Sequence, residues 1–156
     1  MASYYISQEY DVPSVQIWAV LTDFASWPMW FPNLTEVRLP DGVRPAPGVE
    51  LHAVGASPDE WVRWRVVEWD EPQLLMCEHV DSTIPLARGV QAAYLLFELT
   101  DDDEGCRLDV EVGAEGDGLL GDFLVGTTLG MGARRLLPQL VDAFSEHVVR
   151  QAASSR

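Results

Sequence analysis

The chain has 156 residues, of which 47% are hydrophobic, and a formal net charge of −15 from 25 acidic and 10 basic side chains. This length suits one domain with a sizeable core, and the hydrophobic content excludes the composition of disordered chains. The negative charge would repel nucleic acid and anionic membranes over most of the surface. We therefore expect a single globular domain over residues 1–156 that binds no nucleic acid.

The cysteines, the histidines and the N-terminal segment exclude further classes of protein and of site. Cys77 and Cys106 lie far apart without CxxC spacing, which predicts free thiols in a reducing, cytoplasmic setting. His52, His79 and His147 lack HxH and HExxH spacing, so we expect no metal and no other cofactor. The chain begins without signal-peptide features, and no apolar run approaches the roughly 20 residues of a membrane span. We expect neither export nor membrane insertion.

The first part of the chain predicts a strand followed by two short helical pieces. Residues 3–10 favour a strand, and Asp11 and Pro13 then provide helix-start signals. Helical spacing runs from Val15 to Trp27, where a proline interrupts it. The segment WPMWFPN that includes this proline predicts a compact aromatic turn with a second helical piece.

Six more strands and a long helix are predicted from there to the end. The strand-like runs are 34–39, 48–55, 60–69, 73–80, 89–100 and 105–115, separated by turn-forming segments. From Leu119 onward the apolar residues follow helical spacing. This order predicts an α+β fold in which a curved antiparallel sheet of seven strands wraps around the C-terminal helix.

Three segments carry a family resemblance. The segment DVPSVQIWAVLTDFASWPMWFPNLTEVRL resembles the opening of the polyketide cyclase/dehydrase branch of the START and birch-pollen-allergen (SRPBCC) superfamily. EWVRWRVVEWDEPQLL and FELTDDDEGCRLDVEV fit the same pattern, so the resemblance covers nearly the whole chain. It implies the helix-grip fold, with an apolar ligand such as a lipid, hormone, polyketide or aromatic product held between sheet and helix.

A finer resemblance is to the aromatase/cyclases of bacterial aromatic polyketide synthesis. In those enzymes a strand reading W, V, S, H, R places its Trp, Ser and Arg in the cavity, and the strand here begins at Trp61. The resemblance implies Trp61 as a cavity wall and Arg65 as the group that polarises a polyketide carbonyl, and it matches Trp27 to a tryptophan of the WPxLF segment. Leu34 and Gly132 replace a cavity tyrosine and a helix asparagine, which predicts weak or absent aromatic cyclisation.

The residues leave open which face of strand 60–69 lines the cavity. Alternation separates a polar set from an apolar set on opposite faces. The polar set consists of Trp61, Arg63, Arg65, Val67 and Trp69, and the apolar set consists of Val62, Trp64 and Val66. Hydrophobicity favours burying the apolar set, whereas the resemblance favours a polar lining. We adopt the polar lining as a working hypothesis. It leaves the apolar set on the outside of the sheet as a possible homodimer patch. The alternative is that the polar set forms an exposed Glu–Arg ladder.

Under this hypothesis the candidate catalytic residue is Arg65, because a guanidinium donates paired hydrogen bonds to a carbonyl or enolate. Glu50 and His52 are conceivable bases on the neighbouring strand. The candidate ligand-binding residues are mainly aromatic residues and residues of the long helix: Trp27, Trp30, Leu34, Trp61, Arg63, Phe97, Phe123, Thr127, Gly130 and Met131. Tryptophans in such numbers are more often part of a core than of a binding site.

The sequence thus predicts a protein that binds an apolar, aromatic or polyketide-like small molecule between the sheet and the C-terminal helix. The alternative is a polyketide cyclase, aromatase or dehydratase in which Arg65 polarises a carbonyl. A protein-interaction module of the same fold is a third class, supported only by the apolar strand face.

Overall fold

The computed structural model describes residues 2–83, 90–116 and 118–154, without the side chains of residues 2, 90–91 and 118–133. Its elements are β1 (Ala2–Tyr10), α1 (Ser14–Leu21), the 3-10 helix η1 (Phe24–Met29), β2 (Glu36–Arg38), β3 (Glu50–Val54), β4 (Trp61–Asp70), β5 (Leu74–Ser82), β6 (Val90–Asp101), β7 (Cys106–Gly116) and α2 (Gly118–Ser154). The predicted element order and fold class are confirmed.

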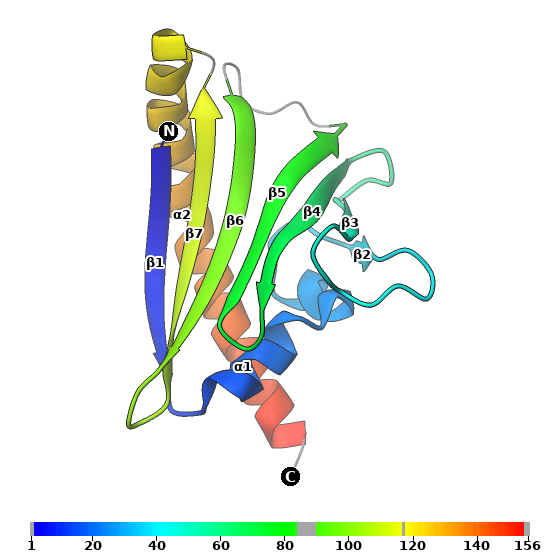
Figure 1. The fold of residues 1–156 in the computed structure, drawn as a ribbon, viewed down its shortest axis with the longest axis vertical. Helices are drawn as coiled ribbons and strands as arrows, with labels where there is room; N and C mark the ends of the chain where they lie inside the picture. The colour runs from blue at the N-terminus through cyan, green and yellow to red at the C-terminus, as the bar shows by residue number, and fades with distance from the viewer. Residues whose placement is uncertain (1, 84–89, 117, 155–156) are drawn as a thin grey trace.

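The strands form one seven-stranded antiparallel sheet in the order β1-β7-β6-β5-β4-β3-β2. The long helix α2 crosses one face of this sheet and contacts β1, β7 and β6 (Figure 1). We call this the inner face and the opposite one the outer face. None of the helices in the described ranges is both long and apolar enough to cross a membrane.

Strand alternation places the core on the inner face. On β7 the residues Cys106, Leu108 and Val110 are buried, while Arg107 between them is exposed. The same alternation continues across β6, β5 and β3, whose buried members are Leu95, Phe97, Leu99, Leu75, Cys77, Leu51 and Ala53. From α2 the core receives Leu137, Leu140, Val141 and Phe144, at helical spacing. The sheet and α2 therefore bury their apolar faces against each other.

An aromatic cluster closes one end of the inner face. Trp27 of η1 lies 6.0 Å from Phe97 of β6 and 5.2 Å from Trp30, measured between ring centroids. Trp30 in turn meets the ring of Phe144 on α2 at 4.9 Å, edge to face. The indole Nε1 of Trp27 donates a hydrogen bond of 2.8 Å to the Leu21 carbonyl, which satisfies its polar atom. This cluster joins α1, η1, α2 and the sheet.

Asp101, at the end of β6, caps α1. Its carboxylate accepts hydrogen bonds from the Ser14 amide at 2.9 Å and the Ser14 hydroxyl at 2.8 Å. These two bonds lower the pKa of Asp101. The helix starts later than Asp11 suggested, with Pro13 at the N-cap position and no side-chain cap from that residue. The cap thus comes from a distant strand, where it fastens α1 to the sheet.

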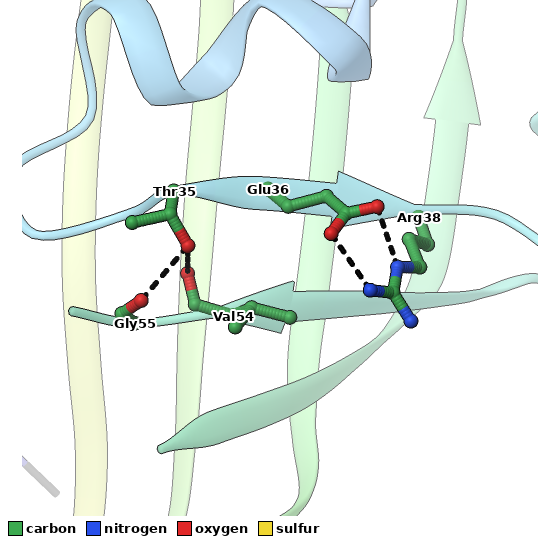
Figure 2. Close-up of polar contacts among 5 residues, drawn as sticks. All are labelled: Thr35, Glu36, Arg38, Val54 and Gly55. Carbon is green, nitrogen blue, oxygen red and sulfur yellow. Dashed lines mark hydrogen bonds and ion pairs between the residues drawn. The ribbon is translucent and has the colours of Figure 1, made fainter. Parts of the chain in front are cut away.

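The far edge of the sheet is a short polar strand (Figure 2). Thr35 Oγ1 donates to the carbonyls of Val54 at 3.3 Å and Gly55 at 2.9 Å, which holds β2 beside β3. Glu36 and Arg38 form a paired ion contact of 2.5 and 2.7 Å on the outer face. A short edge strand with charged side chains offers little surface for pairing with another chain.

Candidate functional site

The charged residues of β3, β4 and β5 form a ladder on the outer face. Arg65 lies directly opposite Glu50 on one side and Glu78 on the other. Its guanidinium nitrogens lie 3.3 Å from Glu50 Oε1 and 3.1 Å from Glu78 Oε1. The three side chains are 43%, 37% and 44% exposed, so this is a solvated ion-pair network. Arg63 joins it at 3.9 Å from Glu50.

The structure reverses the predicted face of β4. Leu51 and Val66 are 1% and 0% exposed in the core, and Trp64 packs against that core, so the apolar set faces inward. The residues expected in the cavity that instead lie on the outer face are Arg65, Glu50, His52, Trp61 and Arg63. Burial of the apolar set is favourable, whereas burying several charges would cost their hydration. The proposed homodimer patch is part of the inner face.

Trp61 takes part in outer-face packing. The Arg63 guanidinium carbon lies 5.2 Å from the Trp61 ring centroid, and the His52 ring lies 5.2 Å from it. A guanidinium at this distance from an indole face makes a cation–π contact. His52, Trp61 and Arg63 therefore pack against one another on the surface of β3 and β4.

The remaining predicted residues divide into two groups. Trp27, Trp30 and Phe97 are buried at 3%, 2% and 1% exposure in the aromatic cluster, and Leu34 is half-buried against the hydrophobic core. Their contact with a ligand stays a prediction. The other four, Phe123, Thr127, Gly130 and Met131, lie in the part of α2 whose side chains are outside the described residues.

Trp30 leaves one buried polar atom unsatisfied. Its Nε1 has no hydrogen-bond partner among the residues that the structure describes. A buried donor without a partner costs about 1–3 kcal/mol, which a carbonyl or hydroxyl oxygen from a bound molecule would offset.

Sequence reasoning missed a polar group on the inner face, formed by Trp64, His79 and Ser82. Trp64 of β4 is opposite His79 of β5, so both side chains share the inner face with Leu51. Their ring centroids are 5.9 Å apart, nearly perpendicular. The His79 Nε2 and Ser82 Oγ atoms lie 3.1 Å apart, at hydrogen-bond distance. Binary patterning pointed to Trp64, whereas His79 emerged only from the strand pairing.

The wall around this group is lined by small or half-buried residues. Ala93 of β6 lies opposite Ala114 of β7 on the inner face, where Leu95 and Phe97 fill the same strand face nearer to α1. Trp64, His79 and Ser82 are only partly buried, in contrast to the fully buried Leu51 and Cys77 on the same face. On the inner face, the core residues nearer to α1 are therefore fully buried, whereas Trp64, His79 and Ser82 are partly exposed.

This group can make both flat and polar contacts. Burial lowers the pKa of His79, and the nearby Asp81 carboxylate opposes this only in part. The imidazole is thus neutral at neutral pH and can donate from one nitrogen and accept at the other. Within the described ranges no group of three or more His, Cys, Asp or Glu side chains is arranged to hold a metal ion.

The chain belongs to the family described as "Polyketide cyclase / dehydrase and lipid transport", whose model matches residues 1–152. No curated protein matches it in sequence. A solution structure of a protein from Thermobifida fusca is similar at 22% identity and a TM-score of 0.71, covering 96% of this chain and 95% of that one.

Two other solved structures share the fold. Ara h 8.0201 is 13% identical with a TM-score of 0.68, covering 96% of this chain and 98% of that one.

 The di-domain ARO/CYC StfQ from the steffimycin biosynthetic pathway is 14% identical with a TM-score of 0.68, covering 94% of this chain and 48% of that one. At these identities the likeness concerns the fold.

Replacing Arg65 by Met should change the free energy of unfolding by less than about 1 kcal/mol, because its ion pairs are solvated. Binding of apolar ligands should be unchanged, since Arg65 is on the outer face. Urea unfolding and calorimetric titration measure the two quantities. A loss of binding in a variant that stays folded would contradict the assignment of faces.

His79 should titrate below its ordinary pKa of 6.5, which NMR of its ring signals can follow. The folded state holds the imidazole neutral more strongly than the unfolded chain does. Its contribution to stability is therefore present above about pH 6.5 and is lost as the pH falls through the folded-state pKa. The free energy of unfolding, measured with urea, should therefore change less between about pH 7.5 and about pH 5 for His79→Gln than for the native chain. An equal difference would contradict this linkage.

Proposed function

We propose that this protein binds a planar, apolar small molecule on the inner face of the sheet, beside Trp64. The ligand would direct a polar group toward His79 and Ser82. The observation that carries the proposal is the partial exposure of Trp64 and His79 on the face that also holds the fully buried core residues. An indole wall with a few polar groups is typical of small-molecule sites.

The comparisons support the same class of ligand. The family description includes lipid transport, and StfQ is named as an ARO/CYC protein of a biosynthetic pathway. The neutral imidazole of His79 suits an uncharged ligand better than an anion, because the chain already carries a net charge of −15. A hydroxyl or carbonyl group on the ligand would complete the hydrogen bonding of His79.

A matched pair of probes tests this proposal: 2-naphthol, which has a hydroxyl group, and 2-methylnaphthalene, which has none. His79→Phe should weaken 2-naphthol about tenfold through the loss of one hydrogen bond, and should leave 2-methylnaphthalene within about twofold. Trp64→Leu should weaken both probes, because it removes the flat wall. Native mass spectrometry and calorimetric titration provide the affinities.

Trp61→Leu is the control for this experiment, since Trp61 is on the outer face of the same strand. It should bind both probes like the native chain. The proposal fails if neither probe shows saturable binding, or if Trp61→Leu and Trp64→Leu lose the same affinity.

A polyketide cyclase is the second candidate function, favoured by the imidazole on the inner face. A neutral His79 could take a proton from a CH₂ group between two ketones, and the resulting enolate carbon could attack another ketone. This carbon–carbon bond would close the ring, the imidazolium would protonate the new alkoxide, and loss of water would then leave a double bond in the ring. Arg65 has no part in this scheme, because it is on the outer face.

The departures at Leu34 and Gly132 still predict little cyclase activity. Incubation with a reactive poly-β-ketone should therefore yield the same product mixture with and without the protein, as measured by liquid chromatography. A single regiospecific product that disappears in His79→Gln and persists in Arg65→Met would instead establish the enzyme.

A further inference from the structure

A groove of about 560 Å³ runs between α1 and the C-terminal turns of α2, the two helices at the lower end of the view in Figure 1. Its volume is within the range of small-ligand sites, about 300–1,000 Å³. Apolar and polar side chains both line it: Val12, Ala19, Val20, Val148 and Ala152, with Gln16, Asp23, His147 and Gln151. The inner-face group around Trp64 contributes no residue to this groove.

His147 is the buried polar residue of the groove. It is 2% exposed, and it forms part of the lining of the groove. Burial and the Arg150 guanidinium lower the pKa of His147, while the Asp23 carboxylate opposes the change. A neutral imidazole in this position has a ring nitrogen that can accept a hydrogen bond.

Asp23 provides negative charge at the same groove. It follows the end of α1, and its exposed carboxylate caps no helix and forms no ion pair among the described residues. The C-terminal end of α2 adds partial negative charge from its free carbonyl groups. The chain as a whole has a net charge of −15, so the groove favours a cation.

We propose that this groove binds a small organic ammonium ion with a hydrocarbon chain. The ammonium group donates hydrogen bonds to the Asp23 carboxylate and to His147. The hydrocarbon chain packs against Val20 and Val148. This site is separate from the inner-face site, and the proposal does not depend on the proposed function.

Three six-carbon probes distinguish the chemistry: hexylammonium, hexan-1-ol and hexanoate. We expect saturable shifts of the backbone NMR signals of Ala19, Val20 and Val148 with hexylammonium. Hexan-1-ol should bind at least about fivefold more weakly and hexanoate more weakly still, because neither provides a cation for Asp23. Equal affinities for the three probes, or shifts confined to Trp64 and His79, would overturn the proposal.

Variants then test the two polar partners. Asp23→Asn should weaken hexylammonium about fivefold or more, a modest loss because the carboxylate is exposed. Asp142→Asn makes the same change of charge at an exposed position of α2 outside the groove, and should stay within about twofold. Equal effects of the two variants would show general charge attraction and would refute the site.

His147→Leu replaces the imidazole with an apolar side chain that can be buried at the same position, and so removes both ring nitrogens. It should weaken hexylammonium about fivefold or more while leaving 2-naphthol unaffected, which separates this site from the inner-face site. If this variant fails to fold, the comparison of Asp23→Asn with Asp142→Asn decides the question.

Discussion

The aromatic packing around Trp27 is the interaction on which the rest of the structure depends. Its ring contacts Phe24, Trp30 and Phe97, so one side chain joins η1 to the sheet, and Trp30 extends the contact to Phe144 of α2. The hydrogen bond from Trp27 Nε1 to the Leu21 carbonyl fixes the turn between α1 and η1. Aromatic side chains bury large areas, and edge-to-face pairs add further stabilisation. The cluster closes one end of the inner face.

Strand alternation controls the chemistry of the two faces. A shift of one residue in the assignment of β4 moves its whole apolar set to the opposite face. Carrying Trp61 and Arg65 over from the aromatase pattern makes such a shift, and it would have exposed Trp64 and Val66. The actual arrangement keeps the charges of Arg65, Glu50 and Glu78 in solvent, where their mutual pairing requires no burial of charge.

Three buried or half-buried polar groups among the described residues carry the proposed recognition chemistry. His79 is paired with Ser82 on the inner face, and His147 lines the groove beside α1, whereas Trp30 Nε1 has no hydrogen-bond partner among the described residues. Polar groups in such positions are costly when unsatisfied, and binding of a complementary molecule recovers part of that cost. The groove beside His147 favours a cation because the Asp23 carboxylate lines it, whereas the proposed inner-face site favours an uncharged ligand.

The sequence by itself determined the order of the elements, the seven-stranded sheet and the long helix, because alternation and helical spacing are local properties of the chain. It also identified Trp27, Trp30 and Phe97 as either core or ligand-binding residues. Tertiary structure decided the face of β4, since that depends on burial summed over several strands. A register shift between Val66 and Glu68 brings Trp69 to the core beside Trp18, against simple alternation. The meeting of Asp23 with His147 likewise requires the folded chain, because more than a hundred residues of sequence separate them and only the packing of α2 brings them to one groove.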